Sequence, residues 1–200
     1  MADAAPDLIE RPAESRVQAL RQATHDLHER LDARIMQAQP FASRTAYVRF
    51  LEVQRRFHAD VAPLYADARL QLVAPDLAAR AKLALIEQDL RDLGTEPSPL
   101  TEPAVDPSDL PAAFGWLYVA EGSSLGAAFL LKEALKLGLD PDFGARHLAA
   151  HPEGRGLHWR RFTQALDAAP LSADEDARAV AGAAAAFARV RALVDDLMPK

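Results

Sequence analysis

Cysteine is absent from this chain of 200 residues, which excludes disulfides, zinc–thiolate sites, iron–sulfur clusters and cysteine nucleophiles together. Basic side chains are also in short supply, with 23 Lys and Arg against 29 Asp and Glu, so the positive charge that nucleic-acid binding needs is missing. No uninterrupted apolar run approaches the roughly 18 residues of a membrane span, and residues 1–14 lack the hydrophobic stretch of a signal peptide. The sequence therefore predicts a cytoplasmic protein that binds neither nucleic acid nor membrane.

Glycine is scarce as well, at nine residues, and helix-forming residues dominate the composition. Apolar residues spaced three and four apart predict helices over residues 15–37, 43–72 (bent at Pro63), 75–93, 108–137, 140–149, 157–167 and 172–197. Because no sheet is available, these helices can bury their apolar faces only against one another. We expect one all-α domain over residues 15–200, preceded by a flexible segment, residues 1–14.

Local signals set the expected ends of several helices. Ser108 is a suitable N-cap for the long helix that follows a proline-rich loop, and Gly94 is a suitable C-terminal glycine for the helix before that loop. The four residues from Ser172 to Glu175 have the pattern of a capping box, which predicts the start of the last helix.

The first predicted helix carries two histidines three residues apart. At about 100° per residue, His28 lies about 55° from the middle of the apolar stripe and His25 about 115° away, which places His28 at the edge of the buried face and His25 in water. Asp32 follows His28 at i+4, and Arg21 lies on the same ridge about 10 Å toward the N-terminus. This arrangement suits a metal-bearing ligand that ends in anionic groups, although a boundary histidine in a charged helix fits the spacing as well.

The helix predicted over residues 108–137 gathers its glycines on one face. An arc of about 100° holds Gly115, Tyr118, Gly122, Leu125, Gly126 and Phe129. Each glycine costs up to about 1 kcal/mol relative to alanine in a helix, but it lets the backbone approach a flat partner and lets the helix bend. A planar ligand explains this face, and a tight helix–helix crossing through Gly122 and Gly126 is the alternative.

The other histidines carry weaker signals. His147 and His151 have the i,i+4 spacing of a metal-binding pair but lack a suitably placed carboxylate, and His58 is expected to be a partly exposed polar residue. No histidine follows a glutamate by three residues, which excludes the ferritin-like di-iron site of helical bundles. No nucleophile elbow or glycine-rich phosphate loop is present.

Two segments, taken in order, resemble the two heme-contacting helices of heme oxygenases. ATHDLHERLD (residues 23–32) resembles their proximal helix, and GWLYVAEGSSLG (residues 115–126) resembles their glycine-rich distal helix. FGARHLA (residues 143–149) and Trp159 are similar to the stretch that follows the distal helix in the bacterial, biliverdin-producing branch. The resemblance covers nearly the whole chain from about residue 15, and it implies a heme-oxygenase-like bundle with the ligand sandwiched between the two helices.

The resemblance also implies roles for individual residues. His28 matches the axial ligand of the heme iron, with Asp32 behind it where the family usually has glutamate. Arg21 and Tyr118 match positions that contact the heme propionates. The distal residues that it implies for catalysis are Gly122, Ser123 and Gly126, with Ser123 beside the oxygen site. Further expected heme contacts are Leu125, Phe129 and Phe187.

The implied reaction uses heme b as both substrate and cofactor, with O2 and electrons from an external reductant, and yields biliverdin, carbon monoxide and ferrous iron. Arg21 and Tyr118 resemble the arrangement of the α-selective enzymes, so we expect biliverdin IXα. The electron donor would be a ferredoxin, a flavoprotein reductase or an ascorbate-like reductant, for which Arg11, Arg16 and Arg21 are expected docking residues. A biliverdin-binding photoreceptor is a further expected partner, and the protein is expected to be a monomer.

Other functions compete with this interpretation. A non-catalytic heme-binding or heme-transfer protein of the same fold could keep His28 and the pocket without turnover. A related helical fold that handles thiamine derivatives needs a cysteine nucleophile, which this chain lacks. A purely structural helical adaptor would leave the glycine face unexplained.

Overall fold

The computed structural model describes residues 15–199, and within that range it contains helices and no extended strand. The expected N-terminal segment, residues 1–14, lies outside the described residues. The helices are α1 (Arg16–Gln37), α2 (Arg44–Ala66), α3 (Ala68–Val73), η1 (Leu77–Arg80), α4 (Leu83–Asp92), α5 (Leu110–Leu135), η2 (Arg146–Leu148), α6 (Arg155–Ala168) and α7 (Ala173–Leu197). The prediction of an all-α fold is confirmed.

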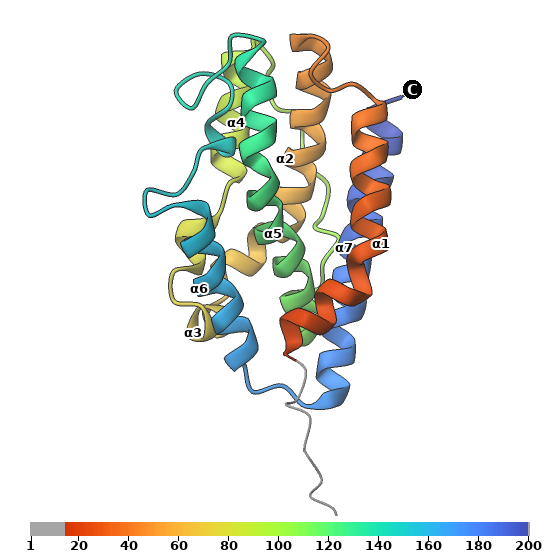
Figure 1. Cartoon of the computed structure of the whole chain (residues 1–200), viewed down its shortest axis with the longest axis vertical. Coiled ribbons are helices and arrows are strands. Elements are labelled where there is room, and N and C mark those ends of the chain that lie inside the picture. Colours follow the sequence, from red (N-terminus) through yellow and green to blue (C-terminus); the bar gives the residue numbers. More distant parts are fainter. Residues whose placement is uncertain (1–14, 200) are drawn as a thin grey trace, which may run out of the picture.

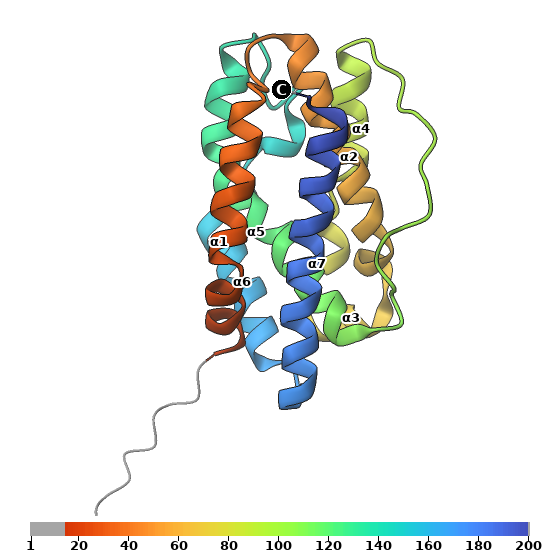
Figure 2. The same ribbon diagram turned by 90° about the vertical axis from the view of Figure 1, so that its right-hand side faces the viewer.

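Helix α5 occupies the middle of the bundle (Figure 1), where it packs against α7, α6 and α2. Helices α1 and α7 lie side by side along one side of the molecule (Figures 1 and 2). Helices α2 and α4 pack against each other on the other side, and η2 closes one end of α4. The core therefore runs along α5, and both α5 and α1 pack mainly on α7.

Helices α5 and α7 cross at very short separation. A Cβ added at Gly115 of α5 would overlap the backbone of Ala179 and Ala183 in α7, and a Cβ added at Gly182 of α7 would overlap the carbonyl of Ala112 in α5. Only glycine leaves room for two backbones at this separation. Gly115 therefore serves helix packing, and not the ligand-facing surface to which its position on the helix had assigned it.

Two predicted helix ends are confirmed by the hydrogen bonds that close them. Ser172 and Glu175 form the capping box of α7. Gly94 has a φ of +72°, and the amide of Thr95 reaches the carbonyl of Leu90 as in a Schellman motif. Pro63 lies inside α2, which continues to Ala66, and the bend expected there stays a prediction.

Four predicted boundaries are wrong, and three of them fail because an aspartate side chain bonds the local backbone. Asp109, not Ser108, caps α5 by accepting from the amide of Ala112. Asp67 caps α3 and so divides the helix predicted over residues 43–72. Asp140 accepts from the amides of Asp142 and Phe143, which replaces the helix predicted over residues 140–149 by a turn.

The fourth boundary concerns the helix predicted over residues 75–93. The structure divides it into the short 3₁₀ helix η1 and the helix α4. Lys82 lies between them at the start of α4.

Helix α5 corrects one expectation from the sequence. It is long and apolar enough, by length and composition, to cross a membrane, although no uninterrupted apolar run reveals this. In the structure α5 is the central helix of the bundle, in contact with α2, α6 and α7. Its apolar character is thus explained by its burial in the core.

We predict that Gly115→Ala destabilises the heme-free protein by about 2 kcal/mol, because the new methyl group forces α5 and α7 apart. Gly126→Ala in the same helix is the matched control: nothing lies within 4 Å of its added Cβ, so better helix propensity should stabilise the protein by about 0.5–1 kcal/mol. Urea unfolding of the two variants measures both changes. Equal effects at the two glycines would contradict this account of the crossing.

Candidate functional site

His28 lies on the exposed surface of α1. Its side chain is 62% exposed, and its Nδ1 lies 3.4 Å from a carboxylate oxygen of Asp32, one turn further along the helix. The edge of its ring meets Phe187 of α7 at a centroid distance of 6.1 Å and an interplanar angle of 77°. This leaves Nε2 of His28 as the nitrogen that can bind a metal or a ligand.

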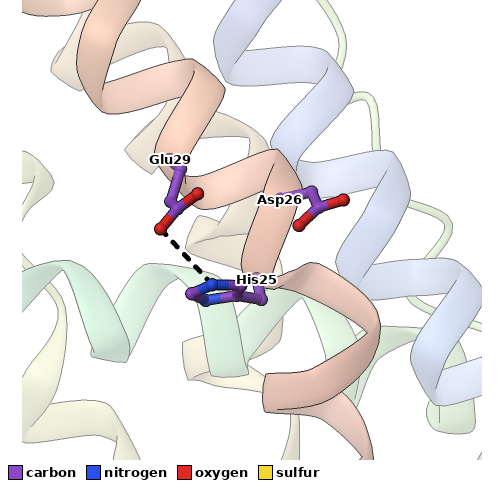
Figure 3. Close-up of side chains that lie close together, drawn as sticks. All are labelled: His25, Asp26 and Glu29. Atoms are coloured by element: carbon purple, nitrogen blue, oxygen red, sulfur yellow. Dashed lines mark ion pairs between the residues drawn. The ribbon is translucent and has the colours of Figure 1, made fainter.

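His25 is as exposed as His28, at 64%, so exposure does not separate the two histidines as the sequence had predicted. Its Nε2 lies 3.3 Å from Glu29 (Figure 3). His25, Asp26 and Glu29 bring one potential metal-ligand atom each within 4.8 Å of one another. All three are exposed on one turn of one helix, so this cluster alone does not define a metal site.

The segment of α5 opposite α1 is open where the sequence placed the ligand-facing surface. Nothing lies within 4 Å of a Cβ built at Gly126, and at Gly122 such a Cβ would reach only Trp159, at 3.6 Å. Leu125 and Phe129 are 45% and 52% exposed despite their apolar side chains. The alternative of a tight helix crossing through Gly122 and Gly126 is therefore wrong.

Tyr118 of α5 contacts α1 at Thr24, one turn N-terminal to His28. It forms a side-chain hydrogen bond with Thr24, and the charge of Arg21 acts on it. Burial raises the pKa of the Tyr118 phenol, while the Thr24 bond and Arg21 lower it. The ring of Tyr118 also packs against Trp159. The structure thus places the Tyr118 phenol within electrostatic reach of Arg21.

Two serines on α5 use their hydroxyls differently. Ser123 is exposed, and its hydroxyl donates to the carbonyl of Ala120 in its own helix at 2.6 Å. The Ser124 hydroxyl accepts from Nζ of Lys82 at 3.0 Å. Burial lowers the pKa of Lys82, which makes its ammonium a stronger acid. Lys82 can therefore hold or donate a proton at the Ser124 hydroxyl, within the open segment of α5.

A buried ion pair fixes α5 immediately before Gly122. Glu121 is 4% exposed, accepts from the Tyr65 hydroxyl at 2.7 Å and pairs with Arg80 at 2.8 Å. Arg80 also donates to Asp76 and to a backbone carbonyl of α6. Because both charges are buried, losing either partner would leave the other uncompensated. This network holds α5 against α2, η1 and α6.

His58 and His147 are both buried, which corrects the expectation that His58 is partly exposed. Nδ1 of His147 lies 2.8 Å from the buried carboxylate of Asp89. Burial lowers the pKa of His58 from 6.5 to about 3 and lowers the pKa of His147, and the nearby charge of Lys82 adds to both shifts. His151 stacks on His158 instead, so the i,i+4 pair of His147 and His151 does not converge on one site.

Arg16 does not offer the free charge that the sequence assigned to it. Its guanidinium pairs with Asp176 and donates to the carbonyl of Leu166, and it is only 8% exposed. Arg21 remains exposed on α1. Of the expected docking residues that the structure describes, Arg21 is exposed and Arg16 is not, while Arg11 lies outside the described residues.

Comparison with known proteins decides the family. The heme oxygenase family profile matches residues 15–196. The chain belongs to the heme oxygenase family. It is 42% identical over 182 residues to heme oxygenase PigA of Pseudomonas aeruginosa, a match that covers 90% of this chain and 91% of the relative. A heme oxygenase of Xanthomonas campestris is 32% identical over 144 residues, covering 70% of this chain and 84% of the relative.

Solved heme oxygenase structures have the same fold. The NO- and CO-bound heme oxygenase of Neisseria meningitidis superposes with a TM-score of 0.88 at 41% identity, and the match covers 93% of each chain. The heme oxygenase of Leptospira interrogans superposes with a TM-score of 0.74 at 18% identity, over 92% of this chain and all of that one, which supports the fold alone. This heme oxygenase is an enzyme that binds heme, uses oxygen and cleaves heme to biliverdin.

Sequence reasoning missed the residues that support the heme oxygenase site from behind. Lys82 and Ser124 are 42 residues apart, and Arg80 and Glu121 are 41 apart, so no local spacing announces either pair. The burial of His58 had a detectable signal, because Phe57 and Val61 mark the same side of α2 as core. That periodicity outweighs the neighbouring arginines that suggested exposure.

We predict that acid destabilises the protein through His58. Its folded pKa of about 3 lies below the ordinary 6.5, so the unfolded chain binds a proton that the folded protein rejects. Stability from this group is complete above pH 6.5 and falls by about 1.4 kcal/mol per pH unit as the pH drops toward 3. Urea unfolding between pH 7 and pH 5 should show a steeper loss of stability in the parent protein than in His58→Gln, and some slope should persist in the variant because His147 and His158, whose pKa values are also lowered, remain in both. Identical slopes would contradict it.

Proposed function

We propose that heme b binds between α1 and the open segment of α5, with Nε2 of His28 as the axial ligand of its iron. The single observation that carries this proposal is the state of the His28 imidazole, whose Nδ1 faces Asp32 while Nε2 is left available. A carboxylate on Nδ1 fixes the ring orientation and keeps the other nitrogen basic, as second-shell partners of metal-binding histidines do.

The residues that face this space fit a flat, largely apolar group. Leu125 and Phe129 expose apolar side chains that a porphyrin would cover, and the space above Gly126 is free. Phe187, beside His28, adds an apolar wall from α7. When bound, heme supplies the iron at which oxygen is activated and is itself the substrate.

Arg21 and Tyr118 would hold the propionate edge of the heme. The charge of Arg21 acts on the Tyr118 phenol, and a guanidinium can bind a carboxylate through two parallel hydrogen bonds. Anchoring one edge fixes the in-plane rotation of the macrocycle and so decides which of its carbons lies nearest the distal residues. We infer that Gly122, Ser123 and Gly126 keep that distal side free of bulky side chains, and that biliverdin IXα is the product.

Electrons for the reaction come, in this proposal, from an external donor. The described residues include no cysteine that could hold an iron–sulfur cluster. Arg21 is exposed on α1 and would offer a positive charge to an acidic donor. The identity of that donor, the cytoplasmic location, the monomeric state and a photoreceptor that receives biliverdin stay predictions from the sequence.

We predict that one equivalent of hemin gives the parent protein a Soret band, and that ascorbate in air replaces this band by biliverdin absorption. His28→Ala should lose the histidine-ligated spectrum and turnover, because no other side chain offers a free Nε2 at that position. Absorption spectroscopy follows both steps. A stable parent complex that never degrades, even with an enzymatic reductant, would favour the heme-transfer alternative, and unchanged ligation and turnover in His28→Ala would refute its role.

We predict that biliverdin IXα is the main product of the parent enzyme. Arg21→Ala combined with Tyr118→Phe should raise the share of other isomers, because the heme then loses its anchor at that edge. Chromatography of the extracted biliverdin gives the isomer ratio. A β or δ isomer as the main product of the parent enzyme would contradict the assignment.

A further inference from the structure

Helix α1 presents two exposed imidazoles on neighbouring positions of its surface. His25 and His28 are 64% and 62% exposed. They are separated by about 4.5 Å along the helix axis and by about 60° around it. A heme displaced by less than one turn along α1 therefore meets a second imidazole. Ligation of the heme iron by His28 alone therefore requires a feature that distinguishes the two histidines.

The two histidines differ in which ring nitrogen is occupied. Each has a carboxylate at i+4, but Asp32 faces Nδ1 of His28 at 3.4 Å, whereas Glu29 faces Nε2 of His25 at 3.3 Å (Figure 3). His28 is left with Nε2, at the far edge of its ring. His25 is left with Nδ1, which is next to its own Cβ and is hindered toward a flat macrocycle. The two nitrogens are chemically distinct in this way in any histidine.

We propose that Glu29 is a positioning residue that selects the axial ligand of the heme: it holds Nε2 of His25 and so confines iron ligation to Nε2 of His28. The inference rests on the proposed heme site, in which His28 binds the iron. Glu29 acts through His25 and contacts neither heme nor iron.

Asp26 provides a matched control within the same turn of α1. It carries the same charge as Glu29, is exposed like it, and lies in the same cluster of potential ligand atoms. Within residues 15–199, however, Glu29 is the carboxylate that pairs with Nε2 of His25. Removing Asp26 thus changes the local charge as much as removing Glu29, but it leaves the contact between Glu29 and Nε2 of His25 in place.

The test removes His28 and measures whether His25 replaces it. Ferrous heme complexes of His28→Ala, His28→Ala/Glu29→Ala and His28→Ala/Asp26→Ala are compared by the iron–histidine stretching band in resonance Raman spectra. Because the exposed ion pair at Nε2 of His25 is lost, we expect about threefold more histidine-ligated heme when Glu29 is removed than in His28→Ala alone. Removing Asp26 should give no increase, and adding His25→Ala to the Glu29 variant should abolish the band.

The outcomes separate two kinds of failure. Equal bands with and without Glu29, an equal gain from Asp26→Ala, or a band that survives His25→Ala would overturn selection by Glu29. Failure of the heme site itself has another signature: the parent band and turnover would then persist in the His25→Ala/His28→Ala double variant. All substituted side chains are exposed, and circular dichroism of each variant verifies that the helices remain.

Discussion

The backbone contact between α5 and α7 is the constraint on which the site depends. At Gly115 and Gly182 the two helices approach more closely than any side chain permits, and this contact fixes the first half of α5. Farther along, at Gly126, the same helix has nothing within 4 Å of an added Cβ. The glycines of α5 thus have two roles. Gly115 allows the close contact with α7, whereas at Gly122 and Gly126 the space beside the helix stays largely open.

Buried charged side chains also hold α5 in place. The pair of Glu121 and Arg80 ties α5 to η1 just before its open segment, and Lys82 reaches Ser124 within that segment. Both bonds join α5 to the stretch from η1 to the start of α4. The segment proposed to meet heme is therefore anchored by these side chains, while Gly122 and Gly126 leave the space beside it free of side chains of their own. Such preorganisation spares a binding site the entropy cost of ordering itself.

Most of the fold could be predicted from the sequence, because apolar periodicity defines α1, α6 and α7 to within about two residues. Prediction failed where one side chain captures a nearby backbone amide, as at Asp67, Asp109 and Asp140. In the site, the proximity of His28 to Asp32 follows from helix spacing. The contacts of Lys82 and Arg80 do not, because they join segments some forty residues apart and depend on how the helices pack.

The exposed apolar side chains of Leu125 and Phe129 have a consequence for the life of the protein in the cell. In the proposed site heme covers them, so heme would add its binding free energy to the folded state, and the heme-free protein would be closer to unfolding. Proteolysis draws on the unfolded fraction. With heme bound there, the amount of enzyme that survives would be coupled to the supply of the molecule it destroys: heme scarcity would leave the chain open to degradation, and heme excess would protect it.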